Sequence, residues 1–288
     1  MKRLRLLLAT LLAIVGATTG WAQDNYGISI GGVDVTSANY TNIKASNGFT
    51  AVKSGKVTYD PTANTLTLNN ATIQSDEAYG IYVQKDALTI FLIGENTISA
   101  SSKSAVAVTR AATITGSGSL TLTSESDCGI YISGSNSRTA TLTIKDCTIS
   151  AEGVWGISGR TAGCNLIVDG ANVSAKGTSG SICDLASLTL NNSSITSPSG
   201  ASWDNSKHAV CNTSGTPITN DWVKITSTVK LYAIYTNSND MLVFYYDDQF
   251  NNREYTYAVG TIYMDLINEC EKLGDYVVNV VEARMGIR

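Results

Sequence analysis

The sequence is poor in proline, histidine and charged residues. Its 288 positions include three prolines, one histidine (His208) and 15% charged side chains. Helix-favouring runs are few, and no apolar run beyond the N-terminus reaches the roughly 18 residues that a membrane-spanning helix requires. A single histidine and the lack of a CxxC pair argue against a zinc site. These shortages favour one elongated β domain with appendages over two compact globules.

The six cysteines have no spacing typical of a disulfide framework. Cys128, Cys147, Cys164 and Cys183 stand at different phases of the chain's internal repeat, as expected of small buried apolar side chains. Cys183 and Cys211 come closest to equal phase on successive turns. A disulfide between these two stays an open alternative in an oxidising compartment.

The first 22 residues have the features of a secretory signal peptide. A basic start precedes an apolar run from Leu6 to Val15, and small residues at Gly20 and Ala22 predict cleavage after Ala22. Removing the three basic residues of this segment from the total of 20 leaves 17 against 24 acidic residues, a net charge of −7. We therefore expect an exported protein, either periplasmic, on the outer surface or secreted. It has no membrane span in the mature chain and no affinity for nucleic acid.

An internal repeat begins at Val57 and ends near Pro198. Its clearest copies are Leu66–Ile73, Leu142–Ile149, Leu166–Val173 and Leu188–Ile195, each an apolar–polar–apolar triplet followed by a polar turn and a second short strand. The last apolar residue of the six copies recurs every 22 to 27 residues, at Ile73, Ile98, Leu122, Ile149, Val173 and Ile195. A nearly constant period in this range is typical of a solenoid.

The residue types predict which solenoid it is. Apolar residues alternate with a period of two, and Thr, Ile and Val occupy strand positions. A third strand signal lies between the copies, as in Gly80-Ile-Tyr-Val83 and Gly129-Ile-Tyr-Ile132. Three strands and three bends per repeat predict an all-β fold, a parallel β-helix of about six turns. Corner residues that tolerate left-handed backbone are expected in one column, at Asn70, Glu95, Ser119, Asp146, Gly170 and Asn192.

The composition changes along the chain and divides it into segments. The open edges and exposed core at the end of a solenoid require a cap, and a Gly-Gly hairpin at Ile28–Val35 supplies one before the first repeat. Eight of the fourteen tyrosines lie beyond residue 230, where two strand signals predict a hairpin. The predicted segments are a signal peptide (1–22), an N-terminal cap (23–56), a parallel β-helix (57–226), a β-hairpin module (227–259) and a tail without an assigned place (260–288).

The third strand of each turn predicts a candidate carbohydrate-binding face. One residue points outward between two inward Ile or Val residues, and successive turns place Tyr82, Ala107, Tyr131 and Ser158 at that position. Tyr82 and Tyr131 are then two strands, or about 10 Å, apart on one outer face. Because sugar rings stack on aromatic faces, this spacing suits an extended glycan.

Basic side chains accompany the two tyrosines. Lys85 and Arg110 stand at equal phase just beyond the tyrosine position, Arg160 stands one residue earlier in phase, and Trp155 is a further candidate member of the patch. Guanidinium and ammonium groups beside aromatic rings suit the carboxylates of uronic acids. The alternative is that these are unrelated surface side chains.

A second column is acidic and forms a candidate calcium site. Its residues follow the terminal strand of each copy at similar phase, and they are Asp76, Glu77, Glu125 and Asp127, with Glu152 in the next turn. Stacked carboxylates suit calcium and an anionic glycan. The alternative is solvated turn charges, partly neutralised by Lys103, in a protein that has no cofactor.

Three phrases carry a resemblance to a known family. The segments Leu66–Ile73, Leu92–Ile98 and Ile114–Leu122 resemble exported bacterial right-handed β-helix proteins that are called carbohydrate-binding domain proteins and share the shape of pectate lyases. The resemblance implies a right-handed coil and, as in some members, binding of acidic plant polysaccharide with calcium. The segment from Tyr232 to Gln249, with Arg253, is similar to the module that precedes leucine-rich repeats in BspA-type bacterial surface proteins. This second similarity implies the alternative of a surface adhesin or scaffold.

Catalysis is the less favoured alternative. Polygalacturonases of this shape carry Asn-Thr-Asp, Asp-Asp, Gly-His-Gly and Arg-Ile-Lys phrases, and none of these occurs in residues 57–226. Lyases of this shape need a calcium-binding acidic cluster and an Arg or Lys base, and glycosidases need paired carboxylates. Residues 57–226 contain isolated charges but no obvious cluster of this kind. We therefore expect no catalytic residues, rather than a polysaccharide lyase or glycoside hydrolase.

Overall fold

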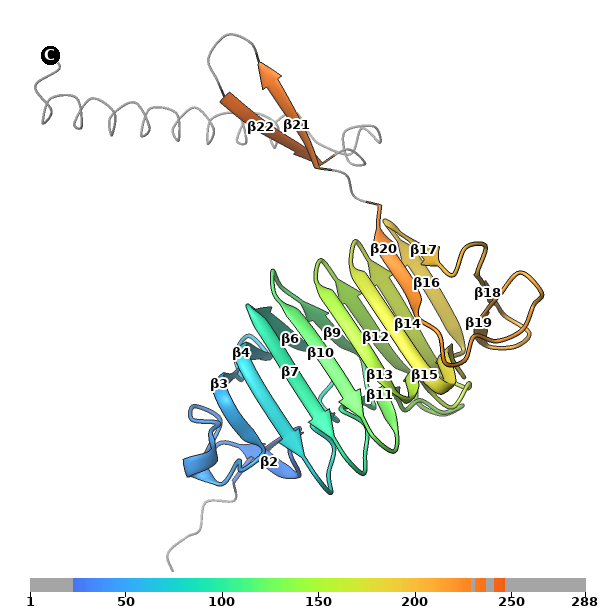
Figure 1. Cartoon of the computed structure of the whole chain (residues 1–288). Helices are drawn as coiled ribbons and strands as arrows, with labels where there is room; N and C mark the ends of the chain where they lie inside the picture. The colour runs from blue at the N-terminus through green and yellow to red at the C-terminus, as the bar shows by residue number, and fades with distance from the viewer. Residues whose placement is uncertain (1–22, 229–230, 237–240, 247–288) are drawn as a thin grey trace, which may run out of the picture. The chain divides into compact units, whose positions relative to one another are not determined.

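The computed structural model of the chain describes residues 23–228, 231–236 and 241–246 (Figure 1). The expected signal peptide and the tail from residue 260, with Cys270, lie outside the described residues. The chain divides into two units, Met1–Ser227 and Thr228–Arg288. In the second unit, β21 (Leu231–Thr236) and β22 (Met241–Tyr246) pair antiparallel, which confirms the predicted hairpin. Within the described residues, no helix has the length and apolar character needed to cross a membrane.

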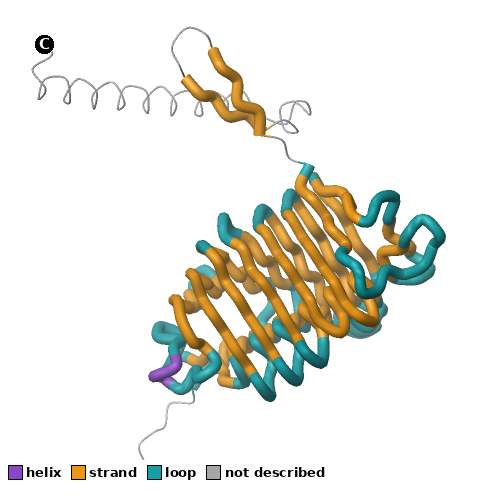
Figure 2. The backbone as a smooth tube through the Cα atoms, viewed as in Figure 1, coloured by secondary structure: helices purple, strands orange, loops and turns teal. Residues whose placement is uncertain are grey.

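The first unit contains a right-handed parallel β-helix of about five turns (Figures 1 and 2). The repeats predicted the parallel β-helix, with about six turns, and the family resemblance implied its right-handed coil. Each turn contributes strands to three sheets. The strands of the successive turns are β4 (Thr65–Ser75) and β5 (Ile81–Val83); β6 (Leu88–Ile93), β7 (Glu95–Ala100) and β8 (Val106–Val108); β9 (Ala112–Thr115), β10 (Ser119–Ser124) and β11 (Cys128–Ile132); β12 (Ala140–Lys145) and β13 (Thr148–Ser158); β14 (Cys164–Asp169) and β15 (Asn172–Cys183).

Parallel pairing between turns defines the three sheets. The first sheet contains the start of β4, then β6, β9, β12, β14 and finally β16 (Ser187–Asn191). The second contains the end of β4, β7, β10 and the first halves of β13 and β15. The third contains β5, β8, β11 and the second halves of β13 and β15. Long strands such as β13 bend from the second sheet into the third.

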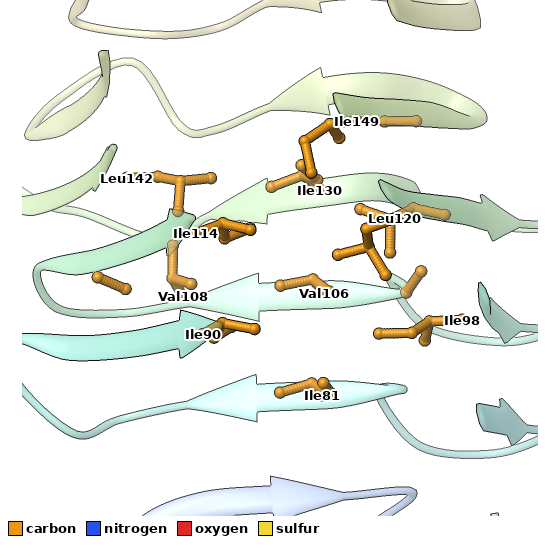
Figure 3. Packing of buried hydrophobic residues seen from close by; sticks show 14 of the residues in the cluster. Ile81, Ile90, Ile98, Val106, Val108, Ile114, Leu120, Ile130, Leu142 and Ile149 are labelled. Carbon is orange, nitrogen blue, oxygen red and sulfur yellow. The ribbon is translucent and has the colours of Figure 1, made fainter. Parts of the chain in front are cut away.

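The alternating pattern puts one branched apolar side chain above another inside the coil. Ile81 pairs with Val106, and Val106 pairs with Ile130, on the inner side of the third sheet. Ile90 and Ile114 form the equivalent pair on the first sheet, and all five side chains are fully buried (Figure 3). Because each such side chain stabilises the fold by about 1.5–3 kcal/mol when it leaves water, the stacked columns hold the turns together.

The predicted single internal file of terminal apolar residues is wrong from its fourth member onward, because Val173 pairs with the shifted Ile149 and Ile225 stands between Val173 and Ile195. Leu122 pairs with Ile98 and Ala151, whereas Ile149 pairs two residues earlier, with Leu120. The second and third turns carry an extra residue at the corner before the second sheet. Because Ala151 is small, the sequence pattern placed the end of the strand at the bulkier Ile149.

Left-handed backbone is confirmed at four of the six predicted corner residues, although Asn70 lies two residues further along its turn than the other three. Asn70, Asp146, Gly170 and Asn192 have positive φ. In the second turn the left-handed residue is Gly94 rather than Glu95, and in the third it is Gly116 rather than Ser119. A Cβ on Gly94 would lie 2.2 Å from the Asn70 amide oxygen, which itself accepts a hydrogen bond from the Glu95 backbone N–H at 3.1 Å. The corner asparagine therefore bonds turn to turn and excludes a side chain from the position stacked beside it.

The N-terminal end of the coil is covered by antiparallel strands. The predicted hairpin is present. It consists of β1 (Asn25–Ile30) and β2 (Val33–Thr36), which pair antiparallel on either side of Gly31-Gly32. β1 pairs with β5, and β3 (Val52–Asp60) pairs with β4 across both the first and second sheets. A short 3-10 helix, η1 (Ala45–Asn47), precedes Phe49, which is fully buried and closes the core.

The C-terminal end is built differently from the prediction. Only five turns are complete, because β17 (Ser193–Ser197) does not continue the parallel ladder of the second sheet. Instead β20 (Val223–Ser227) inserts antiparallel between β15 and β17. On the third sheet, β19 (Ala209–Cys211) pairs antiparallel with β15 and with β18 (Ser202–Asp204).

Candidate functional site

The outer face of the third sheet carries the predicted column of side chains. Tyr82 pairs in register with Ala107, Ala107 with Tyr131, and Tyr131 with Ser158. Tyr82 and Tyr131 are half-buried and flank the buried Ala107. Two strand spacings, or about 10 Å, separate them along the axis of the coil. We call Tyr82, Tyr131 and the Tyr79 ring beside them the tyrosine face.

Tyr79 is a member of this face that the sequence pattern missed. Its ring stacks on Tyr82 with centroids 4.9 Å apart and an interplanar angle of 19°. Burial raises the pKa of the Tyr79 hydroxyl, and the negative charge of Asp127 and the neighbouring hydroxyls of Tyr82 and Tyr131 raise it further. Strand alternation cannot predict the direction of the Tyr79 side chain, because Tyr79 lies in the bend before β5, which begins at Ile81. The Tyr-Gly-Ile-Tyr phrase was the available signal.

Asp127 is held by hydrogen bonds to residues of the third sheet, and its negative charge acts on the Tyr79 hydroxyl. Its carboxylate accepts hydrogen bonds from the Ser104 hydroxyl at 2.9 Å and from the Cys128 thiol at 3.4 Å. Its backbone N–H donates to the Ser124 hydroxyl at 3.0 Å. This network fixes a half-buried carboxylate beside the aromatic rings, where it can accept hydrogen bonds from ligand hydroxyl groups.

The three predicted basic residues follow strands of the third sheet. Lys85 and Arg110 each stand two residues beyond a paired position, since Val83 pairs with Val108, and both side chains are half-buried. Arg160 follows Ser158 by two residues, is exposed and lies one residue earlier in phase than Arg110. The ion pairs formed within the described parts of the chain are Lys145–Asp169 and Lys176–Glu152, so none of the three basic groups has an acidic partner there.

Trp155 lies at the C-terminal side of the face. It pairs in register with Cys128 and Gly180 and packs, half-buried, against Cys183, Ala209 and Cys211. The two cysteines offered for a disulfide thus share one small cluster, and both are free, like the other cysteines of the described residues. Burial raises the pKa of Cys183 to about 12 and also raises that of Cys128, which keeps both thiols neutral.

The proposed calcium column is not assembled as one site. Asp76, Glu77 and Glu125 are exposed turn residues, while the half-buried Asp127 carboxylate is hydrogen-bonded by Ser104 and Cys128. Glu152 is two residues out of phase with Glu125, because it pairs with Thr123, and it forms an ion pair with Lys176 at 3.1 Å. Residues 23–228 contain no group of three or more His, Cys, Asp or Glu side chains placed to hold a metal ion.

The third sheet therefore carries three tyrosine rings on its outer side, with Asp127 and three basic groups without an acidic partner in the described residues near the ends of its strands. No family model, curated protein or solved structure matches the chain. The chemistry of the tyrosine face is accordingly the basis for a functional proposal.

Proposed function

We propose that this protein is an exported, non-catalytic β-helix that binds extracellular polysaccharide on the tyrosine face. The observation that carries the proposal is the register of Tyr82, Ala107 and Tyr131 on consecutive strands. Two rings repeat along the axis of the coil with a methyl group between them, so an extended chain lying across the strands meets aromatic surface at regular intervals.

Ring chemistry supports a sugar ligand. Tyrosine offers a flat apolar face and a polar hydroxyl, and such side chains are suited to surfaces where one end of the contact is apolar and the other is wet. The Tyr82 hydroxyl already accepts a hydrogen bond from the Gln84 amide at 3.3 Å, which orients the ring. Asp127 adds an acceptor for sugar hydroxyl groups beside Tyr79.

The basic groups support an acidic polysaccharide within this class. Lys85, Arg110 and Arg160 have no acidic partner in the described residues, and charge-assisted hydrogen bonds to carboxylates are about twice as strong as neutral ones. Uronic acids present such carboxylates along a polymer. The resemblance to carbohydrate-binding domain proteins also favours an acidic polysaccharide. Because some of those proteins are thought to bind it with calcium, binding is tested both with and without calcium.

A glycan array probed with the purified exported chain, with and without calcium, tests the proposal. We expect signals on polygalacturonate or related uronic acid polymers and weaker signals on neutral glucans. Binding that needs calcium would favour the acidic residues Asp76, Glu77 and Glu125 as participants. An array without any polysaccharide signal would contradict the proposal, and depolymerisation of pectin by the protein would contradict the non-catalytic assignment.

A surface adhesin or scaffold is the second candidate. The observation that favours it is the separate C-terminal unit, whose β21–β22 hairpin forms a sheet of its own. A variant that ends at Thr228 discriminates between the two functions. It keeps polysaccharide binding if the tyrosine face is the site, whereas it loses retention at the cell surface if the C-terminal unit attaches the protein there.

A further inference from the structure

The third sheet lies between two corners of opposite charge. The corner after it consists of the connections to the first sheet in four consecutive turns, residues 84–87, 109–111, 133–139 and 159–163. It contains four basic residues and one acidic residue, Asp86, which gives a net charge of +3. The corner before it consists of the connections from the second sheet, residues 76–80, 101–105 and 125–127. It contains four acidic residues and Lys103, which gives a net charge of −3. An anionic ligand on the tyrosine face is therefore attracted toward one corner and repelled by the other.

Each of the four turns supplies one basic side chain to the corner after the third sheet. These residues, which we call the basic corner, are Lys85, Arg110, Arg138 and Arg160. The sequence pattern did not reveal Arg138, because its connection is the longest of the four and places it six residues beyond the end of β11. The loop closes on itself, since the Ser135 N–H donates to the Arg138 carbonyl at 2.7 Å.

The Arg138 guanidinium lies at the end of β11, near the tyrosine face. Its Nη2 donates to the Ser133 carbonyl at 3.1 Å. Ser133 follows Tyr131 by two residues, and its N–H extends the pairing of the third sheet by donating to the Val108 carbonyl at 2.8 Å. The Arg138 side chain is exposed and forms no ion pair within residues 23–228. Arg138 therefore presents a guanidinium group of the kind that pairs with carboxylates.

We propose that the basic corner selects a polysaccharide that carries an anionic group on every sugar residue, and that Arg138 is one of its specificity-determining residues. Successive turns are about 4.8 Å apart, which is close to the length of one sugar residue in an extended chain. A chain that runs along the coil over the tyrosine face then brings each successive carboxylate to the next basic side chain. This inference rests on the proposed function, because the tyrosine face is what holds the polymer beside the corner.

Titration calorimetry of the unaltered exported chain tests the charge requirement with one polymer backbone. The two ligands are polygalacturonate and polygalacturonate with half of its carboxyl groups methyl-esterified, both in calcium-free buffer so that no ion bridges protein and polymer. The half-esterified polymer is expected to bind about threefold to tenfold more weakly, because two of the four basic side chains on average lose a charged partner at the surface.

Variants of Arg138 test its part in this preference. Arg138→Gln is expected to weaken binding of polygalacturonate about twofold to fivefold and to reduce the preference over the half-esterified polymer, whereas Arg138→Lys keeps the charge and most of the preference. The matched control is Lys224→Gln, which removes one exposed charge from β20 at the second sheet and is expected to leave both affinities unchanged. A purely structural role of Arg138 would change both affinities by the same factor and leave their ratio as it is.

The outcomes separate this inference from the proposed function. Equal affinity of the unaltered chain for the two polymers would overturn the inference and leave polysaccharide binding in place, and this measurement does not depend on any variant folding. An unchanged affinity ratio in Arg138→Gln would remove Arg138 from the site. Binding of a neutral glucan without binding of polygalacturonate would also overturn the inference alone, whereas the absence of every polysaccharide signal would overturn the proposed function itself.

Discussion

The second and third sheets are built from the same turns, yet they differ on both surfaces. The outer column of the second sheet contains short hydroxyl side chains that pair in register: Thr72, Thr97, Thr121, Ser150 and Ser174. The third sheet carries the tyrosine face on its outside. Inside, the second sheet holds the buried Asn96, whereas the third holds Ile and Val in register. Strand propensity accounts for the threonines. It gives no reason for aligned tyrosines near three basic groups that have no acidic partner in the described residues, and the proposed polysaccharide binding would account for them.

The largest expected effect is a loss of folding stability at high pH, caused by the buried thiols of the third sheet. Burial raises the pKa of Cys183 to about 12 and raises that of Cys128, from a thiol value of 9.0 in an exposed chain. The unfolded chain therefore releases these protons above about pH 9 while the folded chain retains them, so stability is fully present below pH 9 and falls as pH rises. Urea midpoints at pH 8 and 10.5 measure the loss.

A Cys128→Ala, Cys183→Ala variant is the control for the alkaline effect. It is expected to lose less stability than the unaltered chain over the same pH interval, because the remaining dependence comes from Cys147 and the tyrosines. An identical pH dependence in the variant would show that the third-sheet thiols are not buried as described.

The next largest expected effect is the loss of stability when the buried Asn96 inside the second sheet is replaced. The Asn96 amide oxygen accepts a hydrogen bond from the Ala71 N–H at 2.9 Å, and its nitrogen donates to the carbonyls of Ile93, Gly94 and Ser119 at 3.2–3.3 Å. Asn96→Ala leaves these buried groups unpaired and is expected to lower the free energy of unfolding by about 2–4 kcal/mol.

The neighbouring outward residue is the control for Asn96. Thr97→Ala changes an exposed side chain on the same strand and is expected to shift the free energy of unfolding by less than about 0.5 kcal/mol. Equal losses for the two variants, measured by chemical denaturation, would contradict the role of Asn96 as a bond between turns.

The basic side chains predict a smaller effect, on binding alone. Lys85→Gln with Arg110→Gln is expected to weaken binding to an anionic polysaccharide about threefold to tenfold and to flatten its dependence on salt, because salt screens charge interactions at the protein surface. Lys53→Gln with Lys56→Gln, at the N-terminal edge, is the matched control. Titration calorimetry at low and high salt measures both, and equal salt slopes for the two variants would exclude the basic patch from the site.

The sequence was sufficient to predict a parallel β-helix, although with about six turns rather than five, and the register of the tyrosine column. The Gly-Ile-Tyr phrases of β5 and β11 repeat the same three-residue strand, so counting from Gly80 and Gly129 gave the correct outward position. The predicted register was wrong in the second sheet, because the small Ala151 rather than the bulky Ile149 pairs with Leu122.

Other features depend on contacts that one sequence does not display. Tyr79 joins the face through a bend, and the Asp127 carboxylate is held by hydrogen bonds from Ser104 and Cys128. The insertion of β20 between β15 and β17 reverses a strand direction that alternation cannot reveal, because an antiparallel strand has the same period of two as a parallel one.

Calorimetric titration of a Tyr82→Ala, Tyr131→Ala variant with the best polysaccharide from the array tests the central claim most directly. Ala107 already occupies the same column, so alanine is compatible with the ladder at both positions. Losing two stacking contacts worth about 1 kcal/mol each is expected to weaken binding at least tenfold. Phe91→Ala removes an exposed aromatic ring from the first sheet and should leave the affinity unchanged. Unchanged affinity in the double tyrosine variant would contradict the account.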